Sequence, residues 1–261
     1  MGEEEDLPVG VEPWDGEEMP EGVVSVVPEP DHAEALTLYQ LKFAGEPIDT
    51  RVHAAQSSRG ADLLALCFDQ EPRVAAALLD NSEFGPSHAR MIARHHHNGR
   101  GLEILSRRRS LLADAEVQRR LLQNPQLASD VLARLVTLKA LRDVYKLSID
   151  RDLPERNRVS IRNELRRKYS QAEPEERADL VLRTEGRALL FLVGCTFDGR
   201  MTQILCAKSI VSTLLIGNLA RFSATPPALL AKLIQNPVVK RQPQLRQLLL
   251  KHPNLPSDLK R

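Results

Sequence analysis

The sequence predicts an all-α protein, an α-α superhelix in which helical repeats stack into a solenoid, with a disordered acidic N-terminal tail. Three observations lead to this prediction. A 16-residue segment returns 128 residues later without a gap, Leu-rich helical patterns fill the chain from residue 60 onward, and the first 35 residues carry 12 acidic groups but no Lys or Arg. The remaining residues hold 36 basic and 23 acidic groups, so an acidic tail precedes a basic body.

The returning segment is the strongest of these signals. Residues 116–131, EVQRRLLQNPQLASDV, align with residues 244–259, QLRQLLLKHPNLPSDL. Residues 74–92 align with the first of these segments at an offset of 43, which pairs Asn81 with Asn124. Because 128 is close to three times 43, one period explains both alignments, and a period of this size is typical of units of two or three helices. The identical pairs in the longer alignment are Leu121/Leu249, Leu122/Leu250, Pro125/Pro253, Leu127/Leu255, Ser129/Ser257 and Asp130/Asp258.

The chain is expected to divide into a tail at residues 1–33 and a helical array at residues 34–261. The tail holds five prolines and little apolar pattern, so it cannot bury enough surface to offset the entropy cost of ordering. We expect a short helix and a loop over residues 34–56. Repeat units then follow near residues 60–100, 101–144, 145–190 and 191–261, and the third of these has lost its Asn-Pro pair.

The Asn-Pro pairs between apolar runs are predicted to be turns. Asn accepts left-handed or turn geometry and bonds to its own backbone, whereas Pro cannot continue the preceding helix. The leucines one turn before Asn124, Leu121 and Leu122, are expected to face the core. These conspicuous residues are therefore predicted to be structural.

Two segments carry a resemblance to known repeat proteins. LLQNPQLASDVL at residues 121–132 and LLKHPNLPSDL at residues 249–259 resemble the units of leucine-rich-repeat-variant and HEAT-like proteins, in which an Asn-Pro turn links short helices. Residues 175–259 resemble most closely a family of uncharacterised bacterial HEAT-like proteins. This resemblance implies a fold and no known activity. The iron–sulfur cluster of the leucine-rich-repeat-variant type needs a cysteine cluster, which this chain lacks.

The three cysteines, Cys67, Cys195 and Cys206, stand in apolar surroundings without zinc or redox spacing. We expect buried, reduced thiols and no cofactor. The chain also contains no nucleophile motif and no phosphate-binding loop. It is therefore predicted not to be an enzyme, and no catalytic, cofactor-binding or metal-binding residue is assigned.

The histidines His95, His96 and His97 form a run seven residues after His88. They are expected at a helix end, where partly protonated imidazole suits the negative end of the helix dipole and helps to satisfy the last carbonyls. A metal site and a pH-sensitive contact are the alternatives.

Basic residues are the remaining functional signal. A basic helix face on a solenoid could bind an acidic protein surface or track phosphates, but the interleaved acids also fit a solvated helix face with internal ion pairs. The candidate partner-binding residues are Arg107, Arg108, Arg109, Lys139, Arg142, Lys146, Arg158, Arg162, Arg166, Arg167 and Lys168.

The tail contains one segment that could dock. Val23, Val24, Val26 and Val27 form a short β-prone run between Gly and Pro, and Trp14, the only tryptophan, lies upstream. We expect this segment either to bind a partner or to fold back on the basic helices and compete with a partner. An unstructured solubilising tail is the alternative.

These observations together favour a non-catalytic protein–protein interaction scaffold in the cytoplasm with an acidic partner. Nucleic-acid binding through residues 139–168 is the alternative. No membrane contact is expected, because no apolar run is long enough to span a bilayer. Weak self-association through the C-terminal helix is also expected, because Leu245, Leu248 and Leu249 lack a following polar cap unless a short final turn covers them.

Overall fold

The computed structural model describes residues 32–260, and within this range all regular secondary structure is helical. The prediction of an all-α fold is therefore confirmed. Nearly all of the predicted acidic tail lies outside the described residues, and so do the docking residues Trp14, Val23, Val24, Val26 and Val27. None of the helices in the described range is long and apolar enough to cross a bilayer.

The described residues form seventeen α-helices and two 3-10 helices. In chain order they are α1 (His32–Lys42), α2 (Ile48–Ser57), α3 (Gly60–Leu66), α4 (Pro72–Leu79), α5 (Pro86–His95), α6 (Gly99–Ser106), α7 (Arg109–Leu112), α8 (Ala115–Gln123), α9 (Ser129–Thr137), α10 (Leu141–Ile149), α11 (Glu155–Gln171), α12 (Pro174–Arg183), η1 (Arg187–Phe191), α13 (Gly199–Ala207), α14 (Thr213–Arg221), α15 (Pro227–Gln235), α16 (Pro237–Arg241), α17 (Pro243–Leu250) and η2 (Ser257–Lys260).

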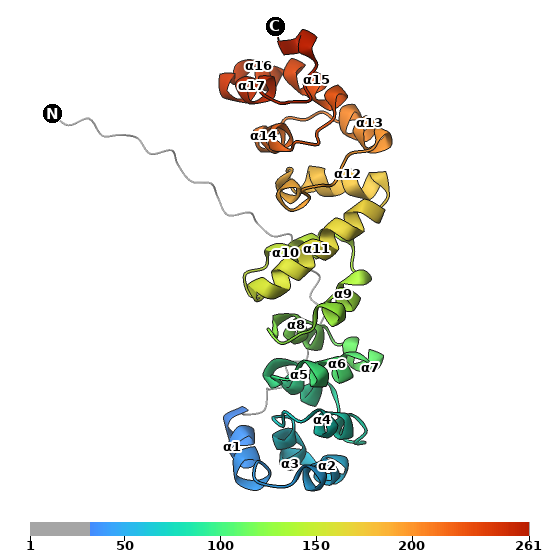
Figure 1. Ribbon diagram of the computed structural model, residues 1–261, viewed down its shortest axis with the longest axis vertical. Coiled ribbons are helices and arrows are strands. Elements are labelled where there is room, and N and C mark those ends of the chain that lie inside the picture. Colours follow the sequence, from blue (N-terminus) through green and yellow to red (C-terminus); the bar gives the residue numbers. More distant parts are fainter. Residues whose placement is uncertain (1–31, 261) are drawn as a thin grey trace, which may run out of the picture.

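The helices stack along one long axis, from α1 at one end to α17 at the other (Figure 1). Many helices pack on the helix two positions further along, as in the pairs α1/α3, α2/α4, α4/α6, α9/α11, α10/α12 and α13/α15, whereas α10 packs most extensively on α11, and α5 and α14 pack on helices three positions along, α8 and α17. Apolar side chains from successive helices form one continuous core along this stack. The arrangement is compatible with a helical-repeat solenoid, in which each unit buries its apolar face against its neighbours.

The segment expected to be a short helix and a loop contains two helices, α1 and α2. The loop prediction is wrong for residues 48–57. Pro47 stands just before α2, where its missing N–H costs nothing, and Asp49 lies in the first turn, where a carboxylate suits the helix dipole. Ala55 is buried and α2 packs against α4, so tertiary contact stabilises a helix that the sequence pattern does not reveal.

The recurrent asparagines link neighbouring units as well as forming turns. Asn124 donates from its side-chain amide to the carbonyl oxygens of Ala93 and His96, both at 2.9 Å. Its Oδ1 accepts from the backbone N–H of Gln126 at 2.9 Å, which confirms the expected bond to its own backbone. Its backbone is extended (φ −77°, ψ 120°), so the left-handed geometry is not used. Asn81 makes the same pair of cross-unit bonds, to Ala55 and Ser58.

The unit near residues 145–190 keeps this link without an Asn-Pro pair. Asn157 lies inside α11 and is buried, and its amide donates to the carbonyl oxygens of Leu122 at 2.8 Å and Asn124 at 2.9 Å. Near the C-terminal end, the side-chain amide of Asn254 donates in a similar way to the carbonyl oxygens of Ser223 and Thr225. The amides of Asn81, Asn124 and Asn157 satisfy carbonyl groups at or just after a helix end, which lack intrahelical partners, and that of Asn254 satisfies carbonyl groups of the loop after α14.

The C-terminal end is partly covered. Leu249 is buried, and Leu259 of η2 packs against the core, as a covering final turn would do. Leu245 and Leu248 stay half-buried and line a second cleft, of about 730 Å³, together with Leu214 of α14. Self-association through this end stays a prediction.

Candidate interaction groove

The predicted basic residues of α10 and α11 are mostly engaged within the fold. Arg158 and Arg162 both bond Glu155, at 2.5 and 2.8 Å. Arg166 donates from Nε to the carbonyl oxygen of Phe191 at 2.7 Å. Three further pairs are Arg167–Glu164, Lys146–Asp143 and Lys168 with the carbonyl oxygen of Thr137. Among these predicted residues Arg142 alone has no partner within residues 32–260. The region thus has the internal ion pairs of a solvated helix face.

The aromatic side chains of this region are not available for stacking on a base. Tyr145 and Tyr169 are both buried. The ring of Tyr145 lies 6.3 Å from that of Phe191, and the guanidinium of Arg162 lies 4.9 Å from the Phe191 ring centroid. Single-stranded nucleic acids are usually bound on exposed aromatic side chains beside basic groups, and these two tyrosines do not supply such a surface.

Three of the other predicted residues, Arg107, Arg109 and Lys139, come together in one groove. The groove lies between α6, α7, α8 and α9 and has a volume of about 840 Å³. Arg134 adds a fourth basic side chain. Arg108 points elsewhere and pairs with Asp80. We call this the α6–α9 groove, and its apolar lining consists of Leu112, Ala113, Val131, Leu135 and Leu138.

Leu138 is the most unusual residue of the groove. It is the C-cap residue of α9 and is 95% exposed, whereas Val131 on the same helix is fully buried. An exposed leucine alone needs no explanation. Here, however, it adjoins the half-buried Leu112 and Leu135 in a concave surface with four basic side chains, which is the composition of a binding site rather than of scattered surface.

A short polar chain holds one end of the groove. The side-chain amide of Gln118, on α8, donates to the carbonyl oxygen of Leu112 at the end of α7, at 2.6 Å. Lys139 in turn donates to Oε1 of Gln118 at 3.0 Å. Gln118 therefore joins three elements and fixes the position of Lys139.

Within residues 32–260, the arginines of the groove make only exposed ion pairs, or none. Arg107 pairs with Glu103 at 2.7 Å and Arg134 with Asp130 at 3.2 Å, and all four side chains are at least one-third exposed. Exposed pairs of this kind contribute about 0–1 kcal/mol each, so an incoming carboxylate can exchange with them. Arg109 has no hydrogen-bond or ion-pair partner in the described part of the chain. The groove thus offers positive charge that an acidic ligand can use.

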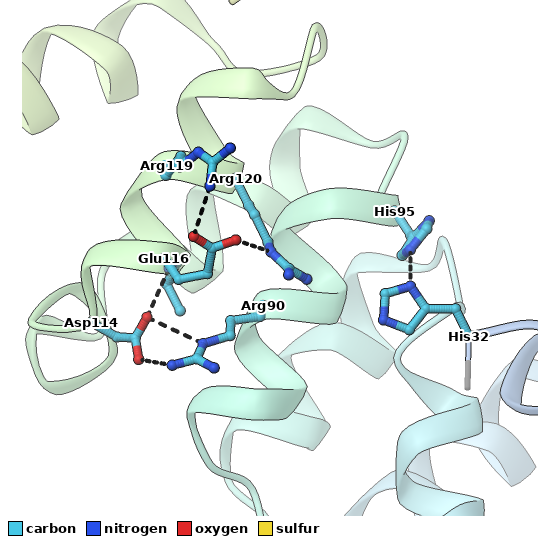
Figure 2. A network of polar contacts seen from close by, with 8 residues as sticks. His32, Arg90, His95, Asp114, Glu116, Arg119 and Arg120 are labelled. Carbon is cyan, nitrogen blue, oxygen red and sulfur yellow. Dashed lines mark hydrogen bonds and ion pairs between the residues drawn. The ribbon is translucent and has the colours of Figure 1, made fainter. Parts of the chain in front are cut away.

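A network of ionic contacts anchors α8, one wall of the groove, to α5. Figure 2 shows Arg90 of α5 bonding both carboxylate oxygens of Asp114, at 3.3 and 2.6 Å. Asp114 also caps α8 by accepting from the N–H of Val117 at 2.9 Å. The Arg90 contact and this backbone bond hold the pKa of Asp114 below its usual value of 3.8. Within α8, Glu116 accepts from the buried Arg120 at 2.8 Å, and it is the Arg90–Asp114 contact that ties the start of α8 to α5.

His95 and His96 of the histidine run lie in different environments. The Nε2 atom of His95 lies 3.2 Å from the Nδ1 atom of His32 (Figure 2). Burial is the main cause that lowers the pKa of His95 to about 4, and the nearby positive charges of His32 and Arg94 lower it further. His96 is fully buried beside Asn98, and burial lowers its pKa too. The predicted helix-end position is confirmed, since His95 ends α5 and His96 is its C-cap residue, but the lowered pKa values of both disfavour the expected protonation. Within residues 32–260 no three His, Cys, Asp or Glu side chains are placed to hold a metal ion.

The structure shows how deeply each of the three cysteines is buried. Cys67 and Cys195 are buried and free, as expected, whereas Cys206 is half-buried.

Sequence reasoning missed Arg134 and Leu138 as groove residues. The available signal was in LARLVTLKA, where Leu138 continues the apolar pattern beyond the buried face and lies one turn from Arg134.

Comparisons of the chain with known protein families, with curated proteins and with solved structures found no match.

Proposed function

We propose that this protein is a non-catalytic protein–protein interaction scaffold of the HEAT-like kind, and that its α6–α9 groove binds an acidic segment of a partner protein. The observation that carries the proposal is the combination of exposed Leu138 with Arg107, Arg109, Arg134 and Lys139 in one concave surface. We place the protein in the cytoplasm, where its three free thiols would stay reduced.

The two kinds of groove residue have different tasks in this proposal. Burial of an exposed leucine side chain contributes about 1.5–3 kcal/mol, so Leu138 supplies affinity. The basic side chains supply orientation and selectivity for acidic partners, because like charges would be repelled. The preferred ligand is therefore a segment with apolar side chains in the middle and Asp or Glu on either side.

Peptide binding tests this assignment directly. The probe is a fluorescent peptide with two valine pairs flanked by Asp and Glu, and its control is the same peptide with Asn and Gln in their place. Fluorescence anisotropy should show about tenfold tighter binding of the acidic peptide, and a loss of this preference at high salt. Equal binding of the two peptides would contradict the proposal.

Variants then locate the binding site. Leu138→Asp and Arg109→Glu change groove side chains that have little or no role in the fold, and each should weaken the acidic peptide about tenfold. The matched controls are Leu41→Asp and Lys240→Glu, which change exposed residues of α1 and α16 far from the groove along the chain. Control variants that weaken binding as much as the groove variants would place the site elsewhere.

The nucleic-acid alternative is an outcome of the same experiment. If single-stranded RNA or duplex DNA binds with a steep salt dependence, and Arg142→Glu abolishes that binding while Leu138→Asp does not, the basic helices carry the function instead of the groove.

A further inference from the structure

The described chain begins next to the histidine run, at His32. Its ring lies edge to face against the ring of His95, with the centroids 5.1 Å apart. This contact fixes where residues 1–31 join the folded part, at the C-terminal end of α5. That point lies one short helix away from the α6–α9 groove.

Helix α6 spans this interval. It begins at Gly99, which follows His96 and Asn98, and ends at Ser106, which already lines the groove. Eight helical residues rise about 12 Å. The nine residues from Val23 to His32 reach at most about 30 Å. The valine run is therefore long enough to reach the groove from where the described chain begins.

The chemistry of this stretch matches the chemistry of the groove. Residues 21–31, EGVVSVVPEPD, place Val23, Val24, Val26 and Val27 between Glu21 on one side and Glu29 and Asp31 on the other. The groove presents leucines among basic side chains. This is the acidic and apolar pattern that the proposed function requires of a ligand, and it is present in the same chain.

We propose that residues 21–31 occupy the α6–α9 groove of their own chain, so that a partner must displace them. This inference rests on the proposed function of the groove. A tethered ligand acts at an effective concentration of the order of millimolar, so even weak docking competes with a free partner. The acidic N-terminus thereby sets the threshold at which partners bind.

Photocrosslinking in the full chain tests the docking. A benzophenone amino acid replaces Val26, and the crosslinked peptides are identified by mass spectrometry. We expect adducts on residues 107–113 and 131–139 of the same chain. Adducts found elsewhere, or none at all, would overturn the proposal. Mixing isotope-labelled and unlabelled chains identifies adducts between two copies, and groove adducts that join two copies would overturn docking within one chain.

Substitutions in the groove test whether these side chains hold the docked segment. Leu138→Asp and Arg109→Glu should each lower the yield of groove adducts about tenfold, whereas Leu41→Asp and Lys240→Glu should leave it unchanged. Because these four side chains are solvent-exposed, the helical content measured by circular dichroism should stay the same. An unchanged yield in both groove variants would contradict the docking.

Competition separates this inference from the proposed function. In the full chain with Val24→Asp and Val26→Asp, the acidic probe peptide should bind about tenfold more tightly, because its tethered competitor is lost. If the groove binds the probe but the tail variant has the wild-type affinity, the docking fails and the proposed function stands. If crosslinks map to the groove but the chain with Val24→Asp and Val26→Asp binds the acidic and neutral peptides alike, the proposed function fails and the docking stands.

Discussion

The side-chain amide of Asn124 donates a hydrogen bond to the carbonyl oxygen of His96, 28 residues earlier, at 2.9 Å. The same amide also bonds the carbonyl of Ala93, so one side chain satisfies two carbonyls at the end of α5. Asn81, Asn157 and Asn254 repeat this relationship along the stack. The asparagines therefore hold successive units in register, which an apolar interface alone does not ensure.

Replacing Asn124 should destabilise the fold strongly. Asn124→Ala leaves two buried carbonyl groups without donors and should lower the free energy of unfolding by about 2–4 kcal/mol, measured by denaturant titration. Asn124→Asp keeps an acceptor for Gln126 but sets a carboxylate against two carbonyl oxygens, so its loss should be at least as large. The exposed Asn163→Ala, on α11, serves as the control and should change stability by less than about 0.5 kcal/mol. A wild-type stability of Asn124→Asp would contradict the donor role.

Gly101 should not tolerate a methyl group. A Cβ at this position would overlap the ring of the buried His96, which cannot move away because the surrounding core is close-packed. Although Ala is the better helix former, Gly101→Ala should therefore lower stability by about 1–3 kcal/mol. Gly199→Ala, at the start of α13 with nothing within 4 Å, should be neutral or slightly stabilising. Thermal melts of the two variants compare these effects, and an equal change in both would show that the ring does not restrict the site.

The contact between Arg90 and Asp114 should matter more than an exposed ion pair. Asp114→Ala removes the cap of α8 and leaves Arg90 without its carboxylate, so we expect a loss of about 1.5–3 kcal/mol. Asp130→Ala, which breaks the exposed pair with Arg134, should cost less than about 1 kcal/mol. Because the pKa of Asp114 is lowered in the fold, its contribution is present above pH 3.8 and is lost as the pH falls through the lower folded value. Equal losses in both variants would argue against a special role for the partly buried Arg90–Asp114 contact.

The neutral His95 should make the fold sensitive to mild acid. Its pKa is about 4 in the fold against an ordinary value of 6.5, so the unfolded chain binds a proton more readily between these values. Its contribution is therefore complete above pH 6.5 and decreases as the pH falls toward 4. We expect a loss of about 1–2 kcal/mol over this range, reduced from the full linkage value by solvent screening. In His95→Gln this part of the pH dependence should disappear, and melting temperatures recorded from pH 4 to 7 measure it. An unchanged pH profile would show that His95 does not carry the effect.

The cysteines should differ in reactivity. Cys67 is buried, and burial raises the pKa of its thiol, so it should react with a thiol reagent only when the fold opens. Cys206 is half-buried and should react first. Mass spectrometry of the alkylated peptides after increasing times checks this order, and early labelling of Cys67 would contradict the packing around α3.

Some features of this protein can be predicted from its sequence, and others depend on its tertiary structure. The all-helical fold followed from the repeated Leu-rich segments, since amphipathic periodicity is a local property that the sequence displays directly. Helix α2 was missed because its apolar pattern is weak and packing against α4 stabilises it. Asn157 was missed because, without a following proline, nothing in its neighbourhood distinguishes it from an exposed helical residue.

The basic residues show the same division most clearly. The sequence by itself determined how many basic side chains the body carries and that an acidic, valine-containing stretch precedes it. Only the tertiary structure decided that Arg166 donates to the carbonyl oxygen of Phe191, while Arg107, Arg109 and Lys139 meet Arg134 beside Leu138. The reason is physical. Whether a charge is available depends on the carboxylates and carbonyls that the packing of distant helices brings within hydrogen-bond distance, and linear spacing does not encode that distance.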